Sequence, residues 1–208
     1  MPLVPRAPAL VSLLLLAAAL SLPCPRTLAT RRPAAAPDYF PLAVGNSWTY
    51  RAGSPHVDLP EQHFTTTVAA ARRDRAVWFL LRDYQGGDHW VRRTAGRVVE
   101  APARLWYRFD LPVGGSWTMR IAGGLPGSDG ARLTLAARNE TVETPAGTFR
   151  GCLRIDYRHR VADAGVISEW FAPGVGLVKR SESRIFGEWI TLLEQARVNG
   201  REYPAGAR

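Results

Sequence analysis

The chain contains the stretch Phe40-Pro41-Leu42-Ala43-Val44-Gly45-Asn46-Ser47-Trp48-Thr49-Tyr50-Arg51, and a close copy follows 69 residues later as Phe109-Asp110-Leu111-Pro112-Val113-Gly114-Gly115-Ser116-Trp117-Thr118-Met119-Arg120. Eight of the twelve positions are identical. A repeat of this length indicates a duplicated supersecondary unit, because such a unit usually buries its apolar face against its own copy. We call the two stretches the first copy and the second copy. They predict architecture, and they carry no catalytic or cofactor signature.

Each residue type in the two copies has a structural role. Gly45 and Gly114 permit a turn with positive φ directly before a strand. Trp48 and Trp117 follow early in that strand, where a tryptophan can bury roughly 150–250 Å². A ligand-binding role for the two tryptophans is the alternative, but large aromatic side chains within strands usually pack in the core. We therefore expect each copy to start a strand and to anchor it in the core.

Alternation of apolar and polar residues predicts strands along most of the chain, as in Ala131–Arg138 and Gly151–Arg158. Runs rich in aromatic and β-branched residues predict further strands. These runs are Phe64–Val68, Val77–Leu81, His89–Arg93, Leu105–Phe109, Ser116–Ile121, Val166–Phe171, Leu177–Ser181 and Trp189–Val198. The sequence thus predicts an all-β fold of about ten antiparallel strands, in a curved sheet that closes toward a half-barrel or a barrel-like sandwich.

The alternation in Gly151–Arg158 also predicts which side chains are buried. Strict alternation places Leu153, Ile155 and Tyr157 on the inner face. It places the remaining side chains on the outer face, namely Cys152, Arg154, Asp156 and Arg158.

Landmarks after the two copies recur in the same order, which predicts a single β domain at 39–199 with repeat halves at about 40–108 and 109–181. A closing strand at 189–198 follows the second half. Residues 30–38 and 200–208 are expected to be flexible ends. The alternative is that proteins rich in hairpins reuse similar turns by chance.

The first 29 residues have the pattern of a signal peptide. Arg6 provides a basic start, Ala9–Leu22 is mostly apolar, and Thr27-Leu28-Ala29 provides a cleavage site, so we expect the mature chain to begin at Thr30. The apolar run is shorter than the roughly 18–20 residues that span a bilayer. The sequence therefore predicts an exported protein, periplasmic or extracellular, with no transmembrane span in the mature chain.

Cys24 is the candidate site for a lipid anchor. It follows Leu20-Ser21-Leu22-Pro23, which resembles a bacterial acylation site except that Pro23 stands where a small residue is expected. If cleavage follows Ala29 instead, Cys152 is the remaining cysteine. A single cysteine cannot form an internal disulfide.

The composition is strongly basic, with 27 Lys and Arg against 18 Asp and Glu and a net charge of +9. A mature chain starting at Thr30 loses Arg6 and Arg26, which leaves 25 − 18 = +7. Acidic residues interrupt the basic runs, as in Arg72-Arg73-Asp74-Arg75, whereas a nucleic-acid interface shows a one-sided basic stripe. The charge thus disfavours nucleic acid as a partner and leaves attraction to an anionic envelope surface.

Several polar residues are candidates for metal binding or for acid–base catalysis. Four metal-ligand types occur at His56, Asp58, Glu61 and His63, but Pro60 interrupts a regular strand there, which favours a solvated loop. Acid–base pairs could form from neighbouring residues, namely Asp88 with His89 and Asp156 with His159. No nucleophile with an oriented base accompanies them. We therefore expect no catalytic residue, no metal site and no cofactor.

Three further features have a structural explanation that is simpler than a functional one. Cys152 lies among arginines, which could lower its pKa, but a lone thiol lacks the partners of a catalytic cysteine. The glycine-rich stretch Gly123–Gly130 has no helix after it to hold a phosphate, so we interpret it as a hairpin tip. Asn139-Glu140-Thr141 is a formal glycosylation triplet, which by itself carries little weight.

The chain resembles a widespread group of uncharacterised secreted or lipidated bacterial proteins. The resemblance rests on Tyr39–Arg51, on Thr144–Phe149 with Cys152–Ile155, and on Glu169–Lys179. It implies a location in the bacterial envelope and a curved antiparallel sheet, similar to the half-barrel of lipoprotein-localisation carriers. It transfers no catalytic residue, and this chain departs from the lipidated members at Pro23.

Two functions remain open at this point. In the first, a concave sheet face binds a lipid or another apolar ligand, since Val77–Leu81 and Ile190–Leu193 place large side chains on both faces of the sheet. In the second, the interior is fully packed and the protein is a structural or interaction component of the envelope. An apolar cavity of at least about 300 Å³ would favour the first function.

Overall fold

The computed structural model describes residues 37–120, 130–159 and 165–204. The chain divides into two units, residues 1–35 and 36–208, and every described residue belongs to the second unit. The expected signal peptide with Cys24 lies outside the described residues, as do Ile121 and all of the stretch 123–130 except Gly130. The description below therefore concerns the second unit by itself.

The described residues form strands joined by turns and loops, which confirms the all-β fold. The described residues contain thirteen strands, three more than the ten or so predicted, because short or edge strands such as β5 and β13 give weak patterns. The strands are β1 (Ser47–Gly53), β2 (Gln62–Asp74), β3 (Ala76–Tyr84), β4 (Gly87–Thr94), β5 (Arg97–Glu100), β6 (Arg104–Arg108), β7 (Ser116–Arg120), β8 (Gly130–Thr144), β9 (Gly147–His159), β10 (Gly165–Ala172), β11 (Gly176–Arg184), β12 (Gly187–Val198) and β13 (Arg201–Tyr203).

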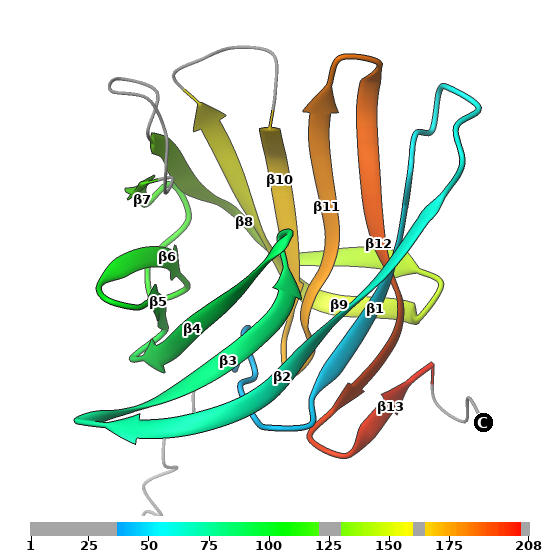
Figure 1. Ribbon diagram of the computed structural model, residues 1–208. Helices are drawn as coiled ribbons and strands as arrows, with labels where there is room; N and C mark the ends of the chain where they lie inside the picture. Colours follow the sequence, from blue (N-terminus) through cyan, green and yellow to red (C-terminus); the bar gives the residue numbers. More distant parts are fainter. Residues whose placement is uncertain (1–36, 121–129, 160–164, 205–208) are drawn as a thin grey trace, which may run out of the picture. The chain divides into compact units, whose positions relative to one another are not determined.

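The strands form one antiparallel sheet that curls into a nearly closed barrel (Figure 1). Strands that are neighbours in the chain pair with each other within the run from β1 to β6 and within the run from β7 to β12. β1 also pairs with β12, which joins the two runs. In the described residues β6 and β7 share no backbone ladder. The indole Nε1 of Trp117 donates to the carbonyl oxygen of Trp106 at 2.9 Å across this seam.

The two copies begin their strands with the same backbone hydrogen bonds. Gly45 (φ 90°) donates to the carbonyl of Val68 on β2, and Gly114 (φ 85°) donates to that of Leu135 on β8. In return, Val68 N–H donates to Asn46, and Leu135 N–H donates to Gly115. The positive φ expected at both glycines is therefore present. The duplication of the whole halves stays a prediction, because these equivalent hydrogen bonds involve only the short segments directly before β1 and β7.

The core of the barrel is aromatic. Phe40 and Phe109, the first residues of the two copies, are both buried and lie at 6.4 and 5.1 Å, centroid to centroid, from the ring of Phe171 on β10. Tyr107 on β6 lies 5.0 Å from the same ring. Such ring pairs add to the gain from apolar burial. The segment before β1 thus fills part of the interior with its own side chains.

The ends of the second unit are more ordered than the sequence analysis expected. Arg201–Tyr203 lies in the segment 200–208 assigned to a flexible tail, but it forms β13 against β12. Asp38, placed in the flexible segment 30–38, pairs with Arg93, and its carbonyl accepts from Gly174 N–H at 2.6 Å. Backbone pairing and a carboxylate contact outweigh the polar composition that suggested flexibility.

Candidate functional site

An open cleft of about 770 Å³ lies at one end of the barrel. It lies among β1, β2, the β3–β4 turn and β10 to β12. Its lining residues are Ala52, Gln62, Phe64, Thr65, Asp83, Gln85, Gly86, Val166, Arg180, Glu182, Arg184, Trp189 and Thr191. A volume of this size suits a small-molecule ligand, and the lining mixes charged, polar and aromatic side chains.

A buried ion pair forms the base of the cleft. Glu169 on β10 is 0 % exposed and lies opposite Arg180 on β11 in the strand register. Arg180 Nε donates to Glu169 Oε1 at 2.9 Å, and Arg180 Nη2 lies 2.7 Å from the same oxygen. Burial disfavours the charged guanidinium, but Glu169 offsets this, so the pKa of Arg180 is raised. An unpaired buried carboxylate would be very costly, and the pairing removes most of that cost.

Tyrosine hydroxyl groups extend the ion pair into a polar network. Tyr157 Oη donates to Glu169 Oε2 at 2.5 Å. Gln85 Nε2 donates to Tyr107 Oη at 3.0 Å, and the hydroxyls of Tyr84 and Tyr107 lie 2.9 Å apart. Burial raises the pKa of all three tyrosines well above the usual value. They are therefore protonated at neutral pH and bind as neutral hydroxyl groups, without acting as bases.

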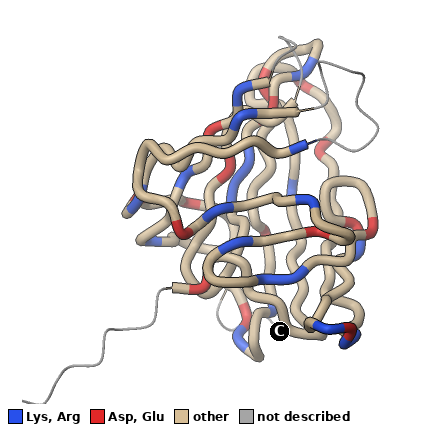
Figure 2. The backbone as a smooth tube through the Cα atoms, turned by 90° about the vertical axis from the view of Figure 1, so that its left-hand side faces the viewer, with Lys and Arg blue, Asp and Glu red and all other residues tan. Residues whose placement is uncertain are grey.

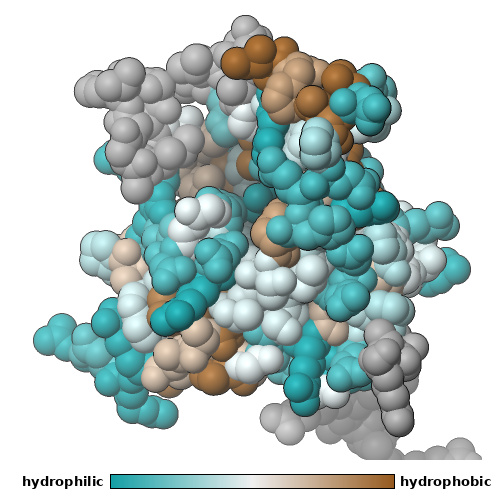
Figure 3. Space-filling model, turned by 45° about the vertical axis from the view of Figure 1, so that its right-hand side comes forward, coloured by the Kyte–Doolittle hydropathy of each residue, from teal (hydrophilic) through white to brown (hydrophobic). Residues whose placement is uncertain are grey.

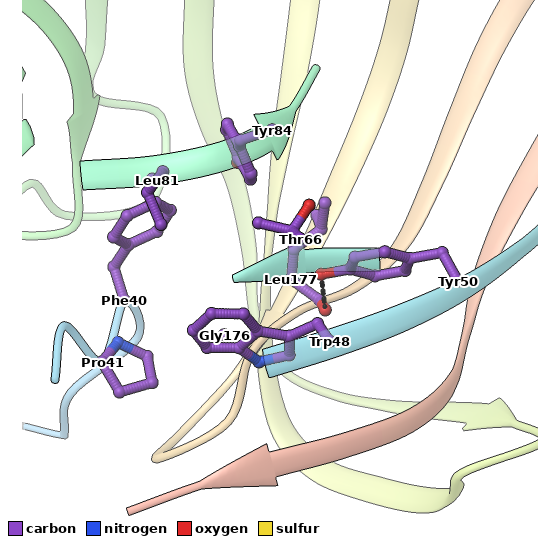
Figure 4. A pocket seen from close by; sticks show the side chains of 9 residues that line it. All are labelled: Phe40, Pro41, Trp48, Tyr50, Thr66, Leu81, Tyr84, Gly176 and Leu177. Atoms are coloured by element: carbon purple, nitrogen blue, oxygen red, sulfur yellow. Dashed lines mark hydrogen bonds between the residues drawn. The ribbon is translucent and has the colours of Figure 1, made fainter. Parts of the chain in front are cut away.

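A small cavity, shown in Figure 4, lies in the apolar interior. Its volume of about 20 Å³ suffices for one water molecule. It lies beside Trp48, whose Nε1 donates to the carbonyl of Val175 at 2.7 Å, and Tyr50, whose hydroxyl donates to that of Leu177 at 3.1 Å. The cavity is far smaller than the 300 Å³ or so that a ligand needs. In the described residues the apolar core is thus packed.

Exposed apolar side chains gather at the rim of the cleft. Ile185 and Phe186 form the tip of the β11–β12 hairpin, and Ile185 is fully exposed. Val57 and Leu59 are exposed in the loop from β1 to β2, and the end of β1 at Gly53 lies opposite Ile190 near the start of β12. Figure 3 shows hydrophobic residues at this end of the molecule on an otherwise mostly hydrophilic face. The rim therefore adds apolar surface to a polar cleft.

The structure does not bring the four candidate metal ligands together. Within the described ranges, no group of three or more His, Cys, Asp or Glu residues is arranged to hold a metal ion. His63 Nδ1 lies 2.9 Å from Glu194 Oε2, and His56 Nε2 lies 4.0 Å from Glu188 Oε2. The two histidines thus contact different residues of β12.

The candidate acid–base pairs are also separate. His89 contacts Glu100 at 2.7 Å and the carbonyl of Tyr84 at 3.1 Å, and neither contact involves Asp88. Asp156 accepts from Ser168 Oγ at 2.8 Å, whereas His159 Nε2 lies 2.8 Å from the carbonyl of Val166. Each group has a local structural partner.

The prediction that Cys152 faces outward is wrong. Its side chain is 0 % exposed, and the thiol donates to the carbonyl of Phe149 at 3.5 Å. Gly151 has a φ of 71°, and the β8–β9 register shifts on both sides of Glu140, the partner of Cys152, so the simple alternation fails there. Burial, with Glu140 nearby, raises the pKa of the Cys152 thiol to about 11. Cys152 is therefore a core residue.

Sequence reasoning missed the pair of Glu169 and Arg180. The sequence contains part of the information needed to predict this pair. The turn Pro173-Gly174 lies midway between the two residues, and a hairpin brings residues at equal distances from its turn together. However, the register shifts between Trp170 and Phe171, which a count along the sequence does not reveal.

A sequence model of the family described as DUF3108-like matches residues 136–184, which is less than half of the chain. No curated protein matches. The solved structures that are similar include a protein of Bacteroides fragilis described as exported and with a YmcC-like fold (15 % identity, 77 % of this chain, 99 % of that chain, TM-score 0.46). A second is a Parabacteroides distasonis protein described as a lipoprotein (15 %, 77 %, 98 %, TM-score 0.40). Similarity at this level carries no functional information about the present chain.

No helix in the described residues is long and apolar enough to cross a membrane.

Proposed function

We propose that this protein is an exported, non-enzymatic β-domain protein of the bacterial envelope that binds an amphipathic ligand in the cleft. The observation that supports ligand binding is the cleft of about 770 Å³. The signal-peptide pattern and the resemblance of Glu169–Lys179 to secreted proteins support export to the envelope.

The lining of the cleft indicates the class of ligand. Phe64 and Trp189 provide aromatic contacts, and the rim adds the exposed Ile185 and Phe186. Arg180 and Gln85 provide hydrogen-bond donors. A purely apolar acyl chain fits the packed interior poorly, since the cavity there measures about 20 Å³. The ligand therefore combines apolar and polar groups.

The decisive experiment is native mass spectrometry of the protein after gentle extraction from its host. We expect the protein to carry a bound molecule of several hundred daltons, because the cleft matches drug-sized ligands in volume. Gln62→Trp places a large side chain in the cleft and should abolish this binding. His63→Trp is the matched control, since His63 is the next residue of β2 and points to the opposite face.

A bound molecule that survives in Gln62→Trp would place the ligand elsewhere. A protein that carries no molecule and does not bind a hydrophobic dye would refute ligand binding altogether.

The second candidate function is a structural or interaction component of the envelope. The packed core, with Phe40, Phe109 and Phe171 in contact, favours this function. Cross-linking in intact cells followed by mass spectrometry would test it. One stoichiometric protein partner, together with an empty cleft, is the expected result for this alternative.

A further inference from the structure

Four side chains on β2, β3 and β4 form a basic and aromatic surface. Arg72 lies opposite Trp78 in the register, and its guanidinium stacks at 4.2 Å from the ring centroid of Trp90. Arg92 stacks in the same way over Trp78 at 5.0 Å. Val91, between Trp90 and Arg92, is fully buried, so its neighbours point away from the core. We call these four residues the arginine–tryptophan face.

The arginine–tryptophan face carries positive charge that the protein leaves unneutralised. Arg73 and Arg75 are exposed beside Arg72 at the end of β2. In the described part of the chain, none of the arginines 72, 73, 75 and 92 forms an ion pair with a carboxylate. Arg73 alternates with Arg72 and points to the other face of β2, whereas Asp74 shares the face of Arg72, so the face itself carries 2 − 1 = +1, and Arg73 and Arg75 add positive charge at its edge. Neighbouring arginines, by contrast, are paired: Arg82 with Asp88 and Arg93 with Asp38. Figure 2 shows the basic residues spread along the strands on this side.

The stacked geometry leaves the guanidinium groups able to bind an anion. All N–H bonds of a guanidinium lie in its own plane, so stacking on a ring leaves the donors at its edge free. Arg72 is exposed, so phosphate oxygens can reach the N–H groups at the edge of its guanidinium, which is where arginine binds phosphate. The surface is therefore complementary to phosphate groups.

The apolar residues of the same surface indicate which class of phosphate-bearing partner it fits. Trp78, Leu80 and Trp90 are half-buried on the outer face. Tryptophan is favoured at the boundary between lipid headgroups and acyl chains, where its ring has apolar and polar contacts. We propose that the arginine–tryptophan face docks the protein on a lipid bilayer that contains anionic phospholipid. This docking is independent of whether the cleft binds a ligand.

Single-stranded nucleic acid is a weaker fit to this surface. Its bases stack on the open faces of aromatic rings. Here the guanidinium groups of Arg72 and Arg92 already cover a face of Trp90 and Trp78. A bilayer needs only that the indoles lie at headgroup level, so the stacked arrangement does not oppose it.

The test is sedimentation of the protein, purified from its host, with phosphatidylcholine vesicles that contain or lack phosphatidylglycerol. We expect binding to the anionic vesicles at low salt and release at about 0.5 M NaCl, where screening shortens the reach of charges. The double substitution Arg72→Gln with Arg92→Gln should weaken binding about twenty-fivefold, because each arginine at an anionic surface contributes a factor of about five.

Arg150→Gln with Arg197→Gln is the matched control, since both residues are exposed on β9 and β12 and removal of two charges is common to both variants. It should weaken binding by less than threefold. Equal loss in both variants, or no binding of the wild type to anionic vesicles, would overturn the proposal. So would binding to single-stranded DNA without binding to vesicles. Salt release of the wild type needs no variant and therefore does not depend on the folding of the mutants.

Discussion

The two copies of the repeated stretch begin their strands alike and end in different surroundings. Gly45 and Gly114 make equivalent bonds to the next strand. However, β1 pairs with a strand on each side, whereas among the described residues β7 pairs with β8 alone. The indole of Trp48 donates to the loop residue Val175, and that of Trp117 bridges the seam to β6. The same local sequence therefore determines where a strand starts. The strands and loops packed around it determine which carbonyl the indole of its tryptophan binds.

The largest effect is expected from truncation of the tryptophans. Trp48→Ala should lower the free energy of unfolding by about 3–5 kcal/mol, as buried Trp→Ala substitutions do. Trp117→Ala should cost less, about 2–3 kcal/mol, because the seam lets the surroundings close around the cavity. Urea denaturation of both variants measures the difference. Equal losses would show that the missing ladder beside β7 has no effect on packing.

Replacement of each indole by a phenyl ring tests the hydrogen bonds. Trp117→Phe leaves the carbonyl of Trp106 without its donor, which should cost about 1–3 kcal/mol. It should also speed amide hydrogen exchange in β6 and β7. Trp48→Phe should cost a similar amount and leave exchange at the seam unchanged. Faster exchange at the seam in both variants would contradict a local role for Trp117.

The two glycines should respond alike. Gly45→Ala and Gly114→Ala should each cost about 1–2 kcal/mol, because an L side chain is strained at φ 90° and 85°. A new Cβ would meet nothing within 4 Å at either position, so steric clashes add nothing. Thermal unfolding of both variants provides the values, and Asn at each position is the control, since it tolerates positive φ better. A large difference between the two sites would break the equivalence.

The smallest effect concerns Asp110, which replaces Pro41 in the second copy. Asp110 accepts from Arg108 at 3.0 and 2.7 Å and from Arg97 at 3.3 Å, and these bonds lower its pKa to about 2. A lowered pKa stabilises the fold fully above the unfolded value near 3.8, and the contribution disappears as pH falls from about 4 to 2. An NMR titration of this carboxyl gives the pKa directly. Asp110→Asn should be slightly less stable at pH 6 and equally stable below pH 2. A carboxyl that titrates near 4 would refute the pairing.

Local patterns predicted the parts of the fold that depend on neighbours in sequence. Alternation in Gly151–Arg158 placed Leu153 and Ile155 correctly in the core. It failed at Cys152, because positive φ at Gly151 and a shifted register turn the side chain inward. The candidate metal and acid–base groups were found as residue types, but nothing in their spacing showed that they would pair with Glu194, Glu100 and Ser168 instead.

The sequence by itself determined an all-β chain, the starts of β1 and β7 and the burial of Trp48 and Trp117, because glycine conformations and apolar alternation act over a few residues. Tertiary structure alone decided that β1 joins β12, that β6 and β7 meet without a ladder, and that Glu169 and Arg180 pair at the base of a cleft. These features depend on register and curvature summed over many strands. A single bulge changes them, and short-range patterns do not record it.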